Sequence, residues 1–569
     1  MKKLIVFIVL SSVLSACVTS KKGHSFFNTL SDSELAVENN SKFIDAISFK
    51  NSGLYEKAIV LLNEIIKSRG DKAPAHFELA KIYKSKSENS KALSHINFAV
   101  ELNPKNKWYI NYKIELTSQF SLYLECEKTY KLRQNIFPEN TDYDLEFTDF
   151  YISNKKYKEA LKLYNKIEEV LGVSHEVNFN KFLIYRGLDE YDNCETEINK
   201  LIDVFPAKSI YYIQYADFKL EHGENDSALK IYNKALSVTP EEPYILNELA
   251  RYNLQHDKEK KAFELYEKVV KDPSFQVSEK RQIIKKFQRL AEVNEKNYDF
   301  LRKLTFLAAK VHPYEPSINI MAGDLAFDER SFKEAVAYYQ KVVDVKLNNY
   351  NAWMQLVIGY YNFSNYDKML EKTQEALELF PTQPSFYFYN GMAKIHNKRF
   401  NEAIEILEEG NDLVLGSSKS LKAQFLSSLG DAYHAIDNNE KSDEYFELSL
   451  ELEPENYYIL NNYAYYLSER NSFLEKAKKM SQLSNQLNPN ESSFQDTYGW
   501  ILFQLGESEL ALDWLLKSTL NGGKDSAVIN EHIGDVYQKL GKLVQARKYW
   551  KLSNEIGGGS SKLPNKLKL

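Results

Sequence analysis

The sequence predicts an all-α protein, an α-solenoid of about fifteen helix-turn-helix repeats that wind into a right-handed superhelix. Three observations support this prediction. The 569 residues include only 14 Pro and 21 Gly, so few positions interrupt a helix. Hydrophobic residues make up 43% of the chain and aromatic residues 13%, which is enough apolar surface to drive packing. Small residues also recur at a constant interval, which indicates one repeated unit rather than several separate cores.

The repeat register is read from the residue near the start of the second helix of each pair. In the first half of the chain these residues lie 34 apart. Two breaks in register follow, around residues 273–282 and 411–420. A small side chain at this position lets the two helices of a pair approach closely, while larger residues fill the space around it. The positions are Ala58, Ala92, Cys126, Ala160, Cys194, Ala228, Ala262, Leu301, Ala335, Met369, Ala403, Ser442, Ala477, Ala511 and Ala546.

Aromatic residues near the middle of the helix pairs are predicted to fill the gap to the next repeat. We expect their hydroxyl groups to stay in water at the edge of the array. A proline or glycine then ends the second helix, because proline cannot continue a helix and glycine adopts the left-handed cap. The aromatic residues concerned are Tyr83, Tyr151, Tyr164, Tyr232, Tyr266 and Tyr339.

Three motifs near the C-terminus carry a family resemblance. They are Leu-Gly-Asp-Ala-Tyr at 429–433, Tyr-Gly-Trp at 498–500 and Ile-Gly-Asp-Val-Tyr at 533–537. With the 34-residue interval, they resemble the tetratricopeptide repeat over residues 39–556. The final third is similar to bacterial outer-membrane tetratricopeptide lipoproteins. Three stretches depart from the family pattern, at 107–140, 175–208 and 282–315.

The N-terminus reads as a processing segment. Lys2 and Lys3 precede an apolar stretch at 4–10, and Leu-Ser-Ala-Cys at 14–17 resembles the lipidation signal of bacterial lipoproteins. We therefore predict a signal peptide over 1–16 and a lipid anchor on Cys17. Val18 follows the cysteine, and the resemblance then implies the outer membrane, with the protein facing the periplasm. The alternative is an ordinary secretory signal with a chance cysteine.

The predicted domains follow from these signals. A lipidated cysteine and flexible spacer at 17–38 precede three repeat sub-arrays, at 39–272, at 273–416 with a degenerate start, and at 417–556. Residues 557–569, which begin Gly-Gly-Gly-Ser, are predicted to form a flexible tail.

The search for chemistry is negative. No metal-protease, nucleophile-elbow, phosphate-loop or calcium-loop motif occurs, so we expect no enzyme, no metal and no cofactor. Asp431, His434 and Glu444 could be imagined as an acid–base set, but solvated helix surface is the favoured interpretation. The formal net charge is −6, and loss of 1–16 removes two lysines and no acid to give −8, which disfavours nucleic acid. Cys126 and Cys194 lie two repeats apart and are predicted to be buried, unpaired thiols.

Candidate binding residues come from the first helices of successive pairs, which in the resembled family line a concave groove for extended peptides or helices. The alternative is that these side chains are buried between neighbouring repeats, or that the predicted facing is wrong by one residue. The clamp of Lys, Asn and Arg that holds a C-terminal carboxylate in chaperone-binding relatives is not matched. The candidates are Met354, Ile358, Tyr361, Phe388, Met392 and Ile395 in mid-array, and Tyr458, Tyr465, Trp500 and Phe503 near the C-terminus.

These observations predict a non-enzymatic scaffold or adaptor that holds proteins during envelope assembly, secretion or wall remodelling. The expected partners are proteins in the groove and the membrane through Cys17, with no small-molecule cofactor. The alternative is a glycan- or nutrient-capturing outer-membrane lipoprotein, for which Trp108 and Trp500 are candidate contacts. A hidden enzyme would need a compact region without repeats, which the sequence does not show.

Overall fold

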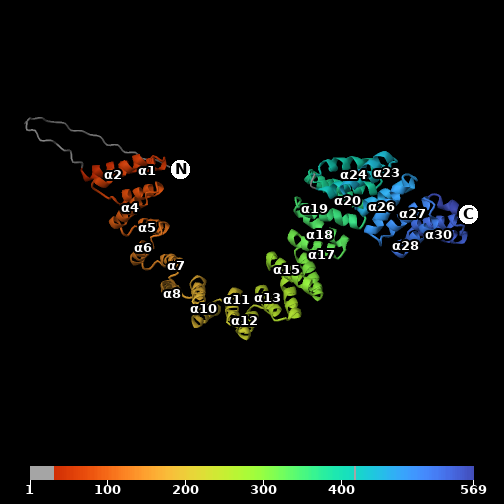
Figure 1. The fold of residues 1–569 in the computed structure, drawn as a ribbon. Helices are drawn as coiled ribbons and strands as arrows, with labels where there is room; N and C mark the ends of the chain where they lie inside the picture. The colour runs from red at the N-terminus through yellow and green to blue at the C-terminus, as the bar shows by residue number, and fades with distance from the viewer. Residues whose placement is uncertain (1–30, 416–417, 569) are drawn as a thin grey trace, which may run out of the picture. The chain divides into compact units, whose positions relative to one another are not determined.

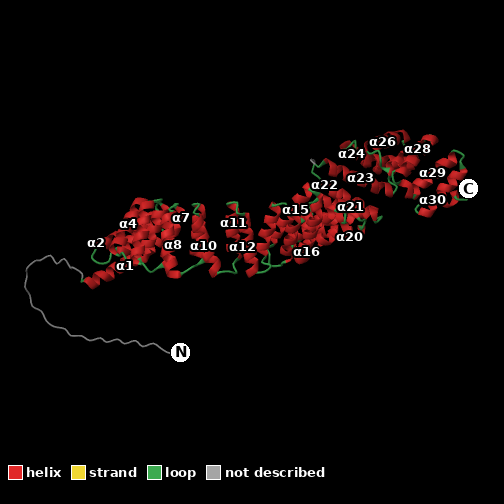
Figure 2. Ribbon diagram, turned by 90° about the horizontal axis from the view of Figure 1, so that it is seen from below, coloured by secondary structure: helices red, strands yellow, loops and turns green. Residues whose placement is uncertain are grey.

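The computed structural model describes residues 31–415 and 418–568, and within these ranges it contains helices and loops but no strand (Figure 2). Cys17 and the predicted signal peptide lie outside the described residues. The helices follow one another in tandem, and within each compact unit they pack against neighbours along the chain (Figure 1). Contacts divide the chain into two compact units, which meet between Val238 and Thr239.

The first unit consists of six helix pairs. Its helices are α1 (Asp32–Asn51), α2 (Tyr55–Lys67), α3 (Ala73–Ser85), α4 (Asn89–Leu102), α5 (Lys107–Gln119), α6 (Tyr123–Ile136), α7 (Thr141–Ser153), α8 (Tyr157–Leu171), the π-helix η1 (His175–Phe179), α9 (Asn180–Gly187), α10 (Tyr191–Val204), α11 (Ser209–Glu221) and α12 (Asn225–Val238).

The second unit adds nine pairs, two 3₁₀ turns and a short terminal helix. Its helices are α13 (Pro243–Gln255), α14 (Glu259–Lys271), α15 (Val277–Val293), η2 (Glu295–Asn297), α16 (Tyr298–Val311), α17 (Pro316–Asp328), α18 (Phe332–Val345), α19 (Tyr350–Asn362), α20 (Tyr366–Leu379), α21 (Pro384–His396), α22 (Phe400–Asp412), α23 (Lys419–Ala435), α24 (Asn439–Leu452), α25 (Tyr457–Glu469), α26 (Leu474–Leu487), α27 (Ser492–Gln504), α28 (Ser508–Leu520), η3 (Gly523–Asp525), α29 (Ala527–Lys539), α30 (Leu543–Ile556) and α31 (Leu563–Lys566).

The predicted register is confirmed at all fifteen pairs in the described ranges. Each of the fifteen positions read from the sequence is the fourth residue of the second helix of its pair, from Ala58 in α2 to Ala546 in α30. All fifteen side chains are buried, including the larger Leu301 and Met369. The polar members bond to the facing helix: Ser442 Oγ donates to the Gly430 carbonyl at 2.9 Å. The position is therefore the contact point of each pair.

A second close contact lies one turn further along the pair. Here a glycine of the first helix faces the eighth residue of the second helix. A Cβ on Gly391 would lie 2.4 Å from Leu407 Cγ, and a Cβ on Gly534 would lie 2.3 Å from Trp550 Cδ1. Glycine is required at these points because a large side chain on the partner helix fills the space that a methyl group would need.

The two breaks in register are longer first helices. α15 and α23 each have 17 residues, whereas α17 and α19 have 13. Four extra residues add about one helical turn, which keeps the same face toward the neighbours. Packing thus continues from α14 to α16 and from α22 to α23. The predicted sub-array boundaries at 272 and 416 do not coincide with the boundary between the two units at Val238.

Both predicted flexible ends need correction. Helix α1 begins at Asp32, inside the spacer predicted over 17–38, because Ser31 and Glu34 form a capping box that fixes its first turn. The tail predicted over 557–569 contains α31, and Leu563 in this helix is 4% exposed. Its apolar side chain packs against Ala546 and Trp550 of the last repeat.

The degenerate repeat at 175–208 replaces apolar contacts with a buried ion network. Lys181, which is 2% exposed, pairs with Glu168 at 2.6 Å and with Glu197 at 2.8 Å. Lys200 reaches the same two carboxylates, at 2.8 and 3.1 Å. Burial alone would raise the pKa of Glu168, but the hydrogen bonds from these lysines and Asn178 lower it to about 2. Each charge depends on its partners, because removal of one would leave an uncompensated buried charge.

The aromatic residues predicted to fill the gaps between repeats are buried as expected. Their hydroxyls, however, do not all stay in water. Tyr339 donates to Asp324 at 2.5 Å, and the Trp550 indole donates to Asp535 at 2.9 Å, each across one pair. The aspartate directly follows the glycine of the close contact in both pairs. A buried donor needs a partner, and this aspartate supplies it.

Asp431 likewise directly follows a glycine of the close contact, Gly430. The side chain that faces this glycine is Phe446, which has no hydrogen-bond donor. Tyr466 of the next first helix donates to Asp431 instead, at 3.0 Å. Burial raises the pKa of Asp431 to about 6, against the opposing effects of Tyr466 and His434. Asp431 is therefore a partly buried residue held by Tyr466, whereas Glu444 is exposed, as expected for helix surface.

Cys126 and Cys194 are buried and unbridged, as predicted. Their thiols point toward the carbonyls of Ile114 and Phe182, at 3.9 and 3.8 Å. Burial raises the pKa of Cys194 to about 12, so the group stays a neutral thiol at neutral pH.

We predict that Gly391→Ala destabilises the array. The new methyl group would overlap Leu407, which is fully buried, and overpacking of this kind costs about 1–3 kcal/mol. This loss outweighs the gain of about 1 kcal/mol in helix propensity. Urea unfolding followed by circular dichroism measures the change. Gly187→Ala is the matched control, because nothing lies within 4 Å of its added Cβ. Equal midpoints for the two variants would contradict the close-contact model.

We predict that Asp431→Asn changes the pH dependence of stability. A carboxyl pKa raised to about 6 means that ionised Asp431 disfavours the folded state, so wild-type stability falls as the pH rises from about 4 to 6. Asparagine removes this fall and should stabilise the protein at pH 7, relative to pH 4, by on the order of 1 kcal/mol. Thermal unfolding at both values measures the difference. The exposed Glu440→Gln is the control, and an equal effect of Asp431→Asn at both values would refute the assignment.

Candidate protein-binding groove

All ten predicted groove residues lie on first helices of the second unit. Met354, Ile358 and Tyr361 lie on α19, Phe388, Met392 and Ile395 on α21, Tyr458 and Tyr465 on α25, and Trp500 and Phe503 on α27. None of the ten is fully buried. Tyr458 is the most exposed at 57%, and Tyr361 follows at 37%. The other eight are partly buried, so groove and core contacts are both present among the ten.

The mid-array group is divided between surface and core. Phe388 meets the ring of Phe425 edge to face at 5.5 Å, and the Ser428 hydroxyl donates to Met392 Sδ at 3.4 Å. Both contacts join α21 to α23, so part of each side chain holds neighbouring repeats together. Tyr361 lies further out, with rings of Tyr389 and His396 within 6.4 Å. Only the outer part of this group is available to a partner.

Near the C-terminus the structure brings three of the four candidates together. Tyr465, Trp500 and Phe503 line a cavity of about 870 Å³ formed by α25, α27, α29 and the chain's C-terminal segment. The Trp500 ring stacks on His532 at 3.9 Å and lies 5.1 Å from Phe503. Tyr458 is not part of this cavity and contacts Phe494 instead. We call the cavity the C-terminal groove.

Acidic groups alternate with the aromatic rings along the groove. Glu469 accepts from Tyr465 at 3.1 Å and lies 3.4 Å from His434. The His434 contact is the main reason that the pKa of Glu469 is lowered, so this carboxylate stays ionised. His532 lies 2.9 Å from Asp496 behind the Trp500 ring. The groove thus combines flat apolar surfaces with fixed negative charge.

The C-terminal segment closes one end of the groove. The Ser560 amide donates to Glu531 at 2.6 Å, and Lys566 pairs with Glu531 at 2.7 Å and with Asp535 at 2.5 Å. Burial alone would raise the pKa of Glu531, but the bonds from Lys566 and Ser560 hold it below its usual range. Sequence reasoning missed these residues, because a glycine run was taken as the start of a loose tail. The alternation of lysine with leucine at 562–568 was the available signal.

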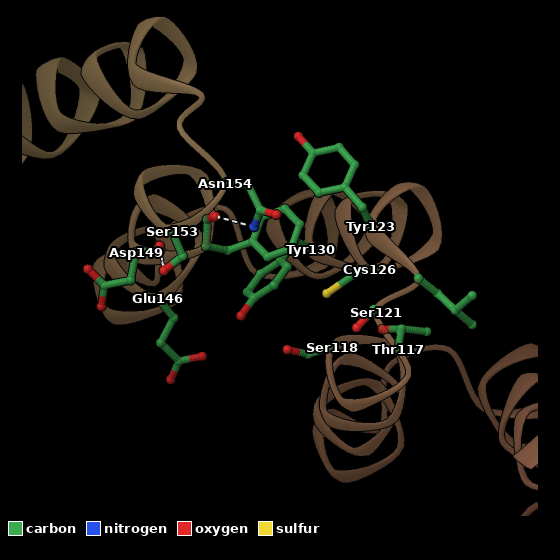
Figure 3. A pocket seen from close by; sticks show the side chains of 12 residues that line it. Thr117, Ser118, Ser121, Tyr123, Cys126, Tyr130, Glu146, Asp149, Ser153 and Asn154 are labelled. Atoms are coloured by element: carbon green, nitrogen blue, oxygen red, sulfur yellow. Dashed lines mark hydrogen bonds between the residues drawn. The ribbon is translucent and has the colours of Figure 1, made fainter.

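A second cavity, of about 520 Å³, lies in the first unit between α5, α6 and α7 (Figure 3). The Ser153 hydroxyl and the Asn154 side-chain amide each donate a hydrogen bond to a carbonyl of α7, at 2.8 Å. Burial raises the pKa of Cys126, so no thiolate forms there at neutral pH. Burial also raises the pKa of Asp149, assisted by Glu146. These residues supply no activated nucleophile.

Within residues 31–415 and 418–568, no group of three or more His, Cys, Asp or Glu side chains is arranged to hold a metal ion. In the same ranges, no helix has both the length and the apolar character that a membrane crossing requires.

Family models match three stretches of the chain. Tetratricopeptide repeat models match residues 216–275 and 423–456, and the model of the TT21 fifth ARM repeats domain matches 315–413. The chain is also 26% identical over 182 residues to TPR repeat-containing protein MJ1428 of Methanocaldococcus jannaschii. This match covers 32% of the chain and 29% of the relative, so the chain spans less than a third of the relative's length.

Solved structures with similar folds include the Cut9–Hcn1 assembly of the APC/C, at 12% identity and a TM-score of 0.39. That match covers 87% of this chain and 96% of the other. PilF of Pseudomonas aeruginosa follows at 20% identity and a TM-score of 0.28, covering 32% and 79% of the two chains. MamA of AMB-1 shares 19% identity at a TM-score of 0.26, covering 30% and 96%. Together the register, the helix pairs and the family matches show an α-solenoid that contains tetratricopeptide repeats.

Proposed function

We propose that this protein is a non-enzymatic scaffold that holds protein partners in the bacterial envelope. Tetratricopeptide repeat proteins typically serve as protein-interaction scaffolds and are generally not catalytic. The observation that carries the proposal is the C-terminal groove, whose acidic end already holds a peptide segment of the same chain beside its aromatic walls. A cavity of this kind offers apolar surface with a few fixed polar groups, which suits recognition of an extended chain.

Binding would draw on two features of the groove. The rings of Tyr465, Trp500 and Phe503 are partly exposed and rigidly placed, so they can cover apolar side chains of a partner with little loss of conformational freedom. The carboxylate of Glu469 is held in place by Tyr465 and His434 and can accept hydrogen bonds from the partner. Tyr361 and Tyr458 extend the exposed aromatic surface along other first helices.

The proposed setting is the periplasmic side of the outer membrane, with the lipid on Cys17 as the anchor. The lipidation signal at 14–17 supports this setting. More than one acyl chain on Cys17 would make attachment effectively permanent, since each buried methylene contributes about 0.8 kcal/mol. The acidic net charge supports proteins rather than nucleic acid as partners.

Glycan capture is the weaker proposal. It relied on exposed aromatic rings at Trp108 and Trp500, and Trp108 is 67% exposed. One face of Trp500, however, is covered by His532, which stacks on it at 3.9 Å. The seated peptide segment favours a protein partner for the C-terminal groove.

We predict that Trp500→Ala removes partner proteins. The full chain is expressed in a bacterial host, solubilised from envelopes and captured, and the copurifying proteins are compared by mass spectrometry. Loss of a buried aromatic anchor at an interface costs about 2 kcal/mol or more, so specific partners should be lost. Trp108→Ala is the matched control, because it removes an exposed tryptophan of the first unit. Retention of every partner by Trp500→Ala would refute the assignment of the groove.

We predict that Cys17→Ser moves the protein from the membrane fraction to the soluble periplasmic fraction, because the acyl chains have no other attachment point. Cell fractionation with immunoblotting measures the change. Ser20→Ala, three residues away, should leave the protein in the membrane fraction. Membrane association of Cys17→Ser equal to wild type would show that a lipid on Cys17 is not the anchor.

A further inference from the structure

The C-terminal groove has a chemical preference that its own contacts reveal. We propose that it binds a lysine-bearing peptide segment of a partner protein, and that residues 557–568 of the same chain occupy one end of the site until the partner displaces them. This inference rests on the proposed scaffold function and adds to it the chemistry of the partner and a competing internal ligand.

Charge complementarity is the first argument. From the repeats, the groove receives the carboxylates of Glu469, Glu531 and Asp535 but only one lysine, Lys539. Glu531 is 3% exposed, so its charge needs a cationic partner to be stable there. The repeats alone therefore leave an excess of negative charge in a partly enclosed space, which favours a cationic ligand.

The seated segment supplies this missing charge. Lys562 and Lys566 both line the groove, and Lys566 bridges the two carboxylates of Glu531 and Asp535. The backbone of the segment also takes part, because the Ser560 amide donates to Glu531. The site thus recognises a main-chain N–H together with a lysine ammonium six residues later, on a segment that folds into the short helix α31.

The aromatic part of the groove remains open beside the segment. Tyr465, Trp500 and Phe503 line the cavity, but the residues that fix the segment lie on α29, and the apolar contact of Leu563 goes to Ala546 and Trp550 of α30. A partner peptide that places a lysine on Glu531 can continue over these rings with apolar side chains. The segment of the same chain thus uses the acidic end of the site and leaves the aromatic end unused.

The segment is also attached in a way that permits its release. It is held by a four-residue helix, and Gly557 and Gly558, with φ of 81° and 94°, join it to α30. Such a glycine linker keeps the segment close to its site at an effective concentration on the order of 1 mM, so it competes with other ligands without blocking them permanently. The competing interpretation is a permanent cap of the terminal repeat.

A peptide-binding experiment on the full chain separates these interpretations. The probe is a fluorescein-labelled peptide with the sequence of residues 557–568, and fluorescence anisotropy gives its Kd for wild type, Lys566→Ala and Lys568→Ala. Lys566→Ala removes both ion pairs of the seated segment, whereas Lys568→Ala removes an exposed charge of the same segment. A second peptide carries glutamate at the positions of Lys562 and Lys566.

We predict that Lys566→Ala binds the lysine peptide about tenfold more tightly than wild type and Lys568→Ala do, because its internal competitor is weakened. The same variant should bind the glutamate peptide at least about tenfold more weakly than the lysine peptide, and added salt should reduce the difference. Thermal unfolding of each variant confirms that the repeats remain folded.

Equal binding of the two peptides to Lys566→Ala, or binding of neither, would overturn the proposal. A lowered unfolding temperature of Lys566→Ala with unchanged peptide affinity would establish the permanent cap instead, which also overturns it. The scaffold function is tested separately: if captured partners still depend on Trp500 while the peptides fail, only the lysine preference is wrong. If Trp500→Ala also retains every partner, the groove is not a binding site.

Discussion

The close approach of the two helices in each pair is the constraint on which the rest of the structure depends. It places a buried and usually small side chain at the fourth residue of each second helix, and often a glycine on the facing first helix, as at Gly391 and Gly534. Neither helix of a pair could bury its apolar face alone, so pairs pack against their neighbours. Each contact between neighbouring pairs adds to the stability of the array. Because the spacing of pairs is fixed by these contacts, equivalent positions on successive first helices come to lie side by side.

This arrangement explains the polar pairs that join neighbouring first helices. Tyr466 bonds to Asp431 over 35 residues, and Ser428 bonds to Met392 over 36. His532 bonds to Asp496 over 36 as well. These separations match one repeat, so each pair joins neighbouring first helices at nearly the same height. In a periodic fold, polar and aromatic residues at equivalent positions of neighbouring first helices therefore come into contact.

The fold was predictable because its signal is repeated fifteen times, so an atypical residue at one position, such as Leu301, does not hide the register. The same register placed all ten predicted groove residues on first helices. The ends were not predictable in this way. Ser31 and Glu34 extend α1 through a local capping box, and Leu563 is buried by a contact with Trp550, which composition alone does not reveal. The lengthened helices α15 and α23 likewise looked like breaks because an added helical turn and an added loop insert similar numbers of residues.

The terminal repeat of a solenoid faces a problem that its interior repeats do not. Here Leu563 packs against Trp550 of the last described pair and covers part of its outer surface. A cap needs only apolar contact, however, and this segment also places Lys566 between Glu531 and Asp535 on the first-helix side. Asp535 also accepts from the Trp550 indole of the last pair, whereas the buried Glu531 bonds to Ser560 and Lys566 of the segment. Burial of a carboxylate costs desolvation free energy that an apolar residue would avoid. The presence of these carboxylates on the groove side is better explained by recognition of a cationic chain than by capping.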